Sequence, residues 1–199
     1  MGGERAAVTM SDDKILLVHV RGDRLTPGTV LVVKAGCWGV TSSGDNVVVS
    51  YIGPPWLEVM STDSRVLHRF KESGAAQTFK WPFFLTTSSD GFIYAADCNA
   101  HEHAIIKLDS SLHVLQTFSD PQLGCPYGLT SVNSDTLLAC NQDNNGIVYV
   151  NVNSGKVTTI LGREDGIVRP DSLAYCPQQR KLFVCTDNKT DSIQVYQMD

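Results

Sequence analysis

The sequence predicts an all-β protein built from repeated units, and three observations support this prediction. First, similar stretches recur along the chain, and their equivalent positions are 45, 44 and 44 residues apart: Gly39, Phe84, Gly128 and Ser172. Second, β-branched and aromatic residues fill alternating segments such as "SIQVYQMD", while Gly, Asn, Asp and Ser fill the gaps. Third, no segment shows the apolar period of an amphipathic helix. Four strands in about 44 residues form a unit of the size of one β-propeller blade, so we expect four-stranded antiparallel blades.

The repeat divides the chain into one propeller domain over residues 1–199, with about four and a half to five blades. A degenerate blade with the runs "KILLVHV" and "TVLVVKAG" is expected first, followed by three full blades and one partial blade: 1–36, 37–80, 81–124, 125–168 and 169–199. Two interpretations of the partial blade remain open. Either the chain is a fragment of a larger ring, which we favour, or its N-terminal strand completes the last blade of a five-membered ring.

Composition narrows the classes of function. The formal charge is −5, from 21 acidic and 16 basic residues, which gives no general electrostatic reason to bind nucleic acid. No apolar run approaches the roughly 18 residues of a membrane span, so no membrane partner is expected. The start, "MGGERAAVTM", lacks the apolar region of a secretory signal. The six cysteines contain no C-x-x-C pair, and we interpret them as reduced thiols of a cytoplasmic protein.

One unit, "WPFFLTTSSDGFIYAADCNAHEHAIIKLDSSLHVLQTF", resembles an NHL repeat. The Arg that usually precedes the Ile of the third strand is missing, and the resemblance covers roughly residues 37–199. The matching positions fall in three units: Pro82, Asp90, Gly91, Ile93, Tyr94, Ala96, Asp97, Asn99, Ile105 and Asp109 in this one, Pro126, Gly128 and Asn145 in the next, and Pro170, Asp187 and Ile193 in the last.

The resemblance implies an incomplete six-bladed propeller similar to the C-terminal propellers of tripartite-motif ubiquitin ligases. Such a propeller would recognise a protein partner or ubiquitination substrate, while RING and B-box modules, which these residues lack, would supply the ligase chemistry. Some relatives bind RNA hairpins through a basic face, so RNA is an alternative partner. The acidic total charge argues weakly against RNA.

Two groups of residues are candidates for partner binding. The aromatic residues Trp38, Trp81 and Tyr127 recur at or beside the start of each inner strand, which borders the central channel of a propeller. They could pack between blades or form a recognition surface. The basic residues Arg65, Arg69 and Lys71 lie between two units and could form either a solvated outer edge or a nucleic-acid footprint.

The segment "DCNAHEH", residues 97–103, is unusually rich in metal-binding side chains. His101 and His103 are two residues apart, so on a strand they would share one face and could both reach a Zn²⁺ ion. The equivalent segment of the next unit is "NQDNNG", a polar turn without histidine. We therefore expect an exposed polar loop, with no bound metal and no cofactor.

An enzymatic alternative follows from a resemblance to gluconolactonase-like and paraoxonase-like propellers, which are metal-dependent hydrolases. Asp97, Asn141 and Asp187 end their strands and could offer oxygen ligands to a Ca²⁺ ion in the channel. The repeat itself demands such residues for turns, however, and no catalytic motif is present. The sequence therefore predicts no catalytic residues and no small-molecule substrate.

Overall fold

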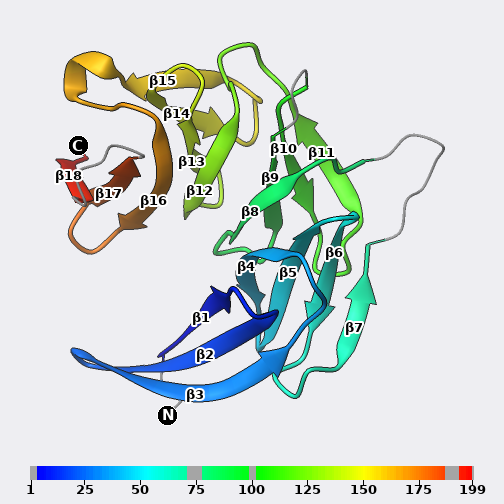
Figure 1. Cartoon of the computed structure of the whole chain (residues 1–199). Helices are drawn as coiled ribbons and strands as arrows, with labels where there is room; N and C mark the ends of the chain where they lie inside the picture. Colours follow the sequence, from blue (N-terminus) through cyan, green and yellow to red (C-terminus); the bar gives the residue numbers. More distant parts are fainter. Residues whose placement is uncertain (1–3, 71–77, 99–101, 187–192, 199) are drawn as a thin grey trace.

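The structure is a computed structural model that describes residues 4–70, 78–98, 102–186 and 193–198 of the chain. Five antiparallel sheets follow one another in chain order as the blades of a β-propeller (Figure 1). The only helical segment among the described residues is a single 3-10 turn, η1 (Arg163–Asp165). No helix in these ranges is long and apolar enough to cross a membrane. The predicted all-β propeller is confirmed.

The strands of each blade follow the chain from the inner strand outward. The first blade holds β1 (Glu4–Met10), β2 (Lys14–Arg21) and β3 (Arg24–Val32). The second holds β4 (Cys37–Ser43), β5 (Asn46–Ile52), β6 (Pro55–Met60) and β7 (Val66–Arg69). The third holds β8 (Pro82–Thr87), β9 (Ile93–Asp97), β10 (Ala104–Leu108) and β11 (Val114–Phe118). The fourth holds β12 (Pro126–Asn133), β13 (Thr136–Asn141), β14 (Gly146–Asn151) and β15 (Val157–Leu161), and the fifth holds β16 (Pro170–Cys176), β17 (Lys181–Thr186) and β18 (Ile193–Gln197).

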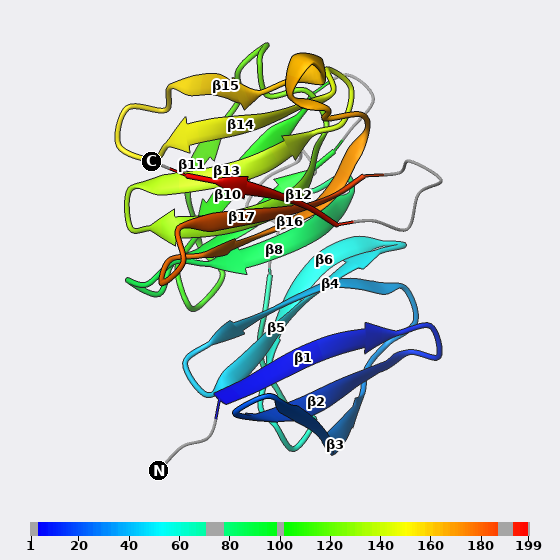
Figure 2. The same ribbon diagram turned by 90° about the vertical axis from the view of Figure 1, so that its left-hand side faces the viewer.

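The N-terminal strand belongs to its own blade. β1 pairs with β2 along its whole length, and its residues run from Glu4 opposite Val20 to Met10 opposite Lys14. The last sheet contains only β16, β17 and β18 among the described strands, and Figure 2 shows β1 in a different sheet. The expected alternative in which the N-terminal strand completes the last blade is therefore wrong for this structure. Within the ranges that the structure describes, the middle three blades have four strands each, and the first and last have three.

The core lies between successive blades. Three buried residues contribute to it, one in the segment that precedes each of the last three blades. Phe79, Leu123 and Ile167 are all fully buried, and each lies 44 residues from the next. Phe79 belongs to a cluster that includes Leu57 of the second blade and Ile106 of the third. Each of these residues comes before the inner strand of its blade, so the connection between blades is itself part of the packed interior.

The repeated glycines allow neighbouring inner strands to approach closely. A Cβ atom on Gly128 of β12 would lie 2.8 Å from the Cα atom of Ser172 on β16. A Cβ atom on Gly39 of β4 would lie 2.6 Å from the carbonyl oxygen of Phe83 on β8. Both distances are shorter than van der Waals contact, and the crowding atoms belong to backbone. Glycine at these positions is therefore required by the spacing between blades.

We expect the substitution Gly128→Val to lower the free energy of unfolding by about 2 kcal/mol, because the added side chain must push β12 away from β16. Urea denaturation followed by tryptophan fluorescence measures this change. Thr130→Val is the matched control, since it changes a half-buried residue of the same strand with little change in volume and should cost less than about 1 kcal/mol. Equal effects of the two substitutions would contradict the proposed role of the close approach.

Candidate functional site

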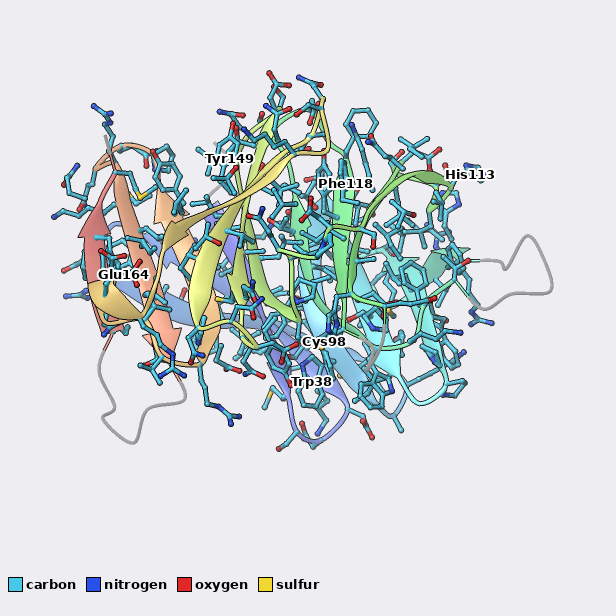
Figure 3. All side chains as sticks on the ribbon, turned by 90° about the horizontal axis from the view of Figure 1, so that it is seen from above. Trp38, Cys98, His113, Phe118, Tyr149 and Glu164 are labelled. Atoms are coloured by element: carbon cyan, nitrogen blue, oxygen red, sulfur yellow. A yellow bond between two sulfur atoms is a disulfide. The ribbon has the colours of Figure 1, made fainter. Side chains whose placement is uncertain are left out.

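Four aromatic side chains meet where the inner strands of the second, third and fourth blades begin. The ring of Phe83 on β8 lies 5.4 Å from Trp38 on β4, 6.0 Å from Trp81 and 5.1 Å from Tyr127 on β12, measured between ring centroids. Trp38 and Trp81 remain 44% and 51% exposed. We call these four residues the aromatic surface; Figure 3 labels Trp38, just below the label of Cys98.

The three aromatic residues selected from the sequence thus lie together, because each of them contacts Phe83, a residue that the sequence analysis did not select. Phe83 is the equivalent of Trp38 and Tyr127 in the repeat, since the three positions are 45 and 44 residues apart. A strict use of the repeat register would have found Phe83, because the residue before the key position is aromatic in three successive units. Trp81, two residues earlier, lies beside this series and extends it toward solvent.

A second group of side chains, which carries sulfur, imidazole and carboxylate, lies next to the aromatic surface. Cys98 follows β9 and His103 precedes β10 in the third blade, while Cys125 precedes β12 and Asp143 lies between β13 and β14 in the fourth. Cys98 and Cys125 form a disulfide with a Cα–Cα distance of 5.0 Å. The Nε2 atom of His103 lies 3.3 Å from Oδ2 of Asp143, and the backbone N–H of Cys125 donates to the same oxygen at 3.2 Å.

These observations correct two expectations. The disulfide shows that Cys98 and Cys125 are not reduced thiols, whereas the other four cysteines are unpaired: Cys37, Cys140, Cys176 and Cys185. The side chain of His103 is only 24% exposed and contacts residues of the next blade, so the expected exposed polar loop is wrong for this residue. His101 lies outside the described residues.

The two groups share one pocket with a volume of about 320 Å³. Its lining combines aromatic side chains with polar and sulfur-containing ones. The residues that line the pocket are Trp81, Phe83, Tyr127, Cys98, His103, Cys125, Gln142 and Asp143. Burial raises the pKa of Tyr127, and the nearby carboxylate of Asp171 adds to this effect. The Tyr127 hydroxyl is therefore neutral at physiological pH and can donate a hydrogen bond.

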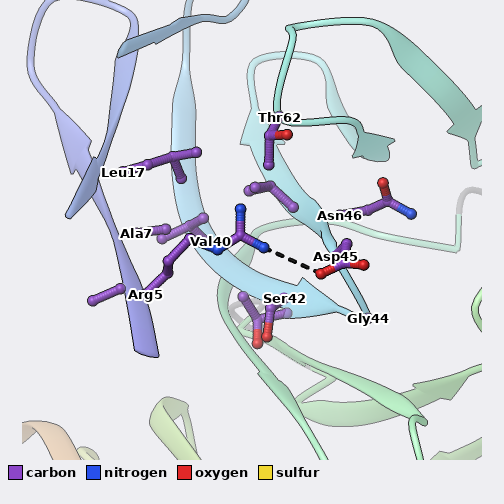
Figure 4. Close-up of a pocket in the computed structure, with 12 residues that line it drawn as sticks. Arg5, Ala7, Leu17, Val40, Ser42, Gly44, Asp45, Asn46 and Thr62 are labelled. Atoms are coloured by element: carbon purple, nitrogen blue, oxygen red, sulfur yellow. Dashed lines mark hydrogen bonds and ion pairs between the residues drawn. The ribbon is translucent and has the colours of Figure 1, made fainter. Parts of the chain in front are cut away.

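A separate hollow of about 420 Å³ lies between the first and second blades (Figure 4). Arg5 on β1 reaches Asp45 in the turn between β4 and β5, with 3.2 Å between Nη2 and Oδ1. The side chain of Asp45 is almost fully exposed, so this ion pair contributes at most about 1 kcal/mol. The hollow contains neither the aromatic surface nor the disulfide.

The basic residues selected from the sequence lie at and beside β7, where one of them is engaged by a buried carboxylate. Arg69 on β7 contacts the buried carboxylate of Glu58, with its Nε and Nη2 atoms 2.7 and 2.6 Å from Oε1. Lys34 approaches the same oxygen at 3.4 Å. Arg65 lies in the turn before β7, where its backbone N–H donates to the Ser61 hydroxyl, and Lys71 lies outside the described residues. The charge of Arg69 is thus balanced within its own blade.

The residues that could have held Ca²⁺ serve as anchors inside their blades. Both oxygens of Asp97 accept hydrogen bonds from the backbone N–H of Lys80, at 3.0 and 3.1 Å, and Oδ1 also accepts one from Trp81 at 2.6 Å. Burial raises the pKa of the Asp97 carboxyl, against the opposing effect of these hydrogen bonds. Asn141 similarly donates through Nδ2 to the carbonyl oxygen of Gln122 at 2.7 Å. Asp187 lies outside the described residues.

The fold and its pocket define a β-propeller with a surface site where the inner strands of the third and fourth blades begin. No family model matches the sequence, and no curated protein matches it. Solved structures do match the fold. One from a nidogen/laminin complex has a TM-score of 0.73 at 13% identity, with 94% of this chain and 76% of that chain covered.

Two bacterial structures share the fold as well. Virginiamycin B lyase from Staphylococcus aureus has a TM-score of 0.62 at 16% identity, with 94% of this chain covered. This chain spans 64% of the length of that lyase. A functionally unknown protein from Desulfotomaculum acetoxidans has a TM-score of 0.64 at 13% identity, with 100% of this chain and 67% of that chain covered. At these identities the likeness establishes the fold and leaves function to the residues of the site.

Proposed function

We propose that the chain is a non-catalytic binding module whose aromatic surface recognises a protein partner. The observation that carries this proposal is that Trp38 and Trp81 are about half exposed yet held against Phe83. Large aromatic side chains that are both exposed and rigidly held lose little entropy on binding and often dominate interface energies. The neighbouring pocket gives a partner side chain a place to insert.

The charge around this surface favours a partner segment that contains Arg or Lys. Asp143 lines the pocket with a side chain that is 57% exposed, and the whole chain carries a formal charge of −5. A cation above an aromatic ring gains about 0.5 to 2 kcal/mol, and a nearby carboxylate adds to this attraction. The same charges disfavour RNA, and Arg69, one of the candidate RNA contacts, is paired with Glu58.

The resemblance to tripartite-motif proteins suggests a more specific role for this binding module. In this proposal the propeller selects a ubiquitination substrate, and zinc-binding modules not contained in residues 1–199 supply the ligase chemistry. The solved nidogen/laminin complex supports the use of this fold in protein binding. The bonds of Asp97 and Asn141 to their own blades support a binding module over a Ca²⁺-dependent hydrolase, the alternative suggested by the sequence.

Selection of displayed random peptides on the immobilised, oxidised protein tests the proposal. We expect enriched peptides to combine an Arg or Lys with apolar residues, and Trp81→Ala to weaken their binding by tenfold or more. Leu115→Ala is the control, because Leu115 is also 50% exposed but lies on the outer strand β11. Enrichment of peptides that bind both variants equally, or of acidic peptides only, would contradict the assignment of this surface.

A further inference from the structure

Two cysteines, a histidine and an aspartate from two successive blades converge in the pocket beside the aromatic surface. We propose that, when the Cys98–Cys125 disulfide is reduced, the two thiolates and His103 bind a Zn²⁺ ion, with Asp143 beside them. The chain therefore has two alternative links between its third and fourth blades, a disulfide in the oxidised form and a metal ion in the reduced form.

The distances suit a zinc site. One ligand atom from each of Cys98, His103 and Cys125 lies within 4.8 Å of the other two. A tetrahedral site with Zn–S bonds of about 2.3 Å and Zn–N bonds of about 2.0 Å has ligand atoms roughly 3.5 to 3.8 Å apart. The two sulfurs must separate when the disulfide breaks, and the imidazole must turn to bring a nitrogen to the shared ion. Side-chain rotation alone can supply these movements.

The histidine is already oriented as metal-binding imidazoles are. Its Nε2 atom faces Asp143 at 3.3 Å, while its Nδ1 atom is buried and has no hydrogen-bond partner among the described residues. A metal-binding histidine commonly gives its second nitrogen to a carboxylate, which fixes the orientation of the ring. We therefore assign Nδ1 as the nitrogen that binds the metal and Asp143 as the residue that positions the ring. A buried nitrogen without a hydrogen-bond partner is otherwise costly.

The backbone hydrogen bonds of the two cysteines do not involve their sulfur atoms. The N–H of Cys98 donates to the carbonyl oxygen of Trp81 at 3.2 Å. The carbonyl oxygen of Cys125 accepts from the N–H of Gln142 at 3.2 Å, and its own N–H donates to Asp143. Reduction breaks one covalent bond but none of these hydrogen bonds. The ligand positions are therefore preorganised for a metal ion.

The exchange between the two forms balances with a dithiol as reductant. The dithiol gives up two electrons and two protons and becomes a disulfide, while the S–S bond between Cys98 and Cys125 breaks to give two thiols. Binding of Zn²⁺ then displaces one proton from each thiol, so two protons are released to solvent. Because the thiolate is the metal ligand, affinity should fall as the pH is lowered.

Zinc titration of the full chain tests this proposal, with a chromophoric chelator as competitor and with the disulfide reduced by a phosphine. We expect one equivalent of Zn²⁺ to bind the reduced protein and none to bind the oxidised protein with comparable affinity. The Asp143→Asn variant should weaken binding by roughly 10- to 100-fold. Cobalt in place of zinc should give a thiolate-to-cobalt charge-transfer band.

Variants separate this site from the other cysteines. The double substitution Cys98→Ser with Cys125→Ser should abolish the tight binding of one equivalent of Zn²⁺. Cys185→Ser, which changes an exposed unpaired cysteine, should leave this binding unchanged. His103→Gln keeps both cysteines, so its disulfide and circular dichroism report whether it folds when oxidised, and it should bind zinc more weakly once reduced. The proposal is overturned if reduced wild type binds zinc no more tightly than the double variant, or if the reduced chain unfolds and zinc does not restore it.

Discussion

Replacing Phe79 with alanine should lower the free energy of unfolding by about 3 to 5 kcal/mol, the usual cost of removing a buried aromatic ring. Phe79 is fully buried between the second and third blades, and its ring meets that of Phe70 edge-on at 4.7 Å between centroids. The cavity would open at the interface between two blades, where the backbone of both sheets limits collapse. Urea denaturation followed by circular dichroism measures the loss.

Two further substitutions test whether the loss of stability depends on burial between blades. Leu123→Ala changes the equivalent residue of the next interface, which is also fully buried, and should cost about 2 to 5 kcal/mol. Leu115→Ala changes an apolar residue that is 50% exposed and should cost less than about 1 kcal/mol. A loss below 1 kcal/mol for Phe79→Ala would mean that the connections between blades are not part of the core.

Removing the Cys98–Cys125 disulfide should cost the second-largest amount, about 3 to 4 kcal/mol. The two cysteines are 27 residues apart, and in the chain-entropy account a closed loop of this length restricts the unfolded chain by about that free energy. The double variant Cys98→Ser with Cys125→Ser should therefore unfold at a lower urea concentration than the oxidised wild type. A chelator must be present during the measurement so that metal binding does not add to the stability of either protein.

The unpaired cysteines supply the control for this experiment. Cys176→Ser and Cys185→Ser alter a half-buried and an exposed thiol that belong to no disulfide, and each should change the free energy of unfolding by less than about 1 kcal/mol. If the double variant were as stable as the oxidised wild type, the crosslink would not restrict the unfolded chain to the expected degree.

The fold could be predicted from the sequence because each blade repeats the same pattern of close strand packing and alternating buried residues. The 44-residue period of positions such as Gly128 and Ser172 reflects inner strands that must pack at one fixed spacing, and the alternation of strand residues reflects burial on the sheet faces. A local pattern of this kind is visible without any knowledge of distant contacts. The aromatic residues Trp38 and Tyr127 could be selected for the same reason.

The contacts that complete the candidate site could not be read in this way. Cys98 and His103 belong to one repeat, whereas Cys125 and Asp143 belong to the next, and a comparison of repeats aligns such residues without bringing them together. The equivalent loop of the next unit lacks histidine, so the repeat gives no indication of what His103 contacts. Its real neighbours are the start of the next inner strand and the turn after β13, and only the packing of the blades places them there.

Extensive contacts between described strands join only blades that follow one another in the chain, so the molecule behaves as a short linear array. The middle blades have two packed neighbours and the end blades have one. In a protein limited to residues 1–199, fluctuations that open the structure locally should therefore begin at the first and fifth blades and move inward. The bond between Cys98 and Cys125 ties the third blade to the fourth, away from both ends. In such a protein we expect the pocket beside this bond to stay closed longest, because it lies between two blades that each have a packed neighbour on both sides.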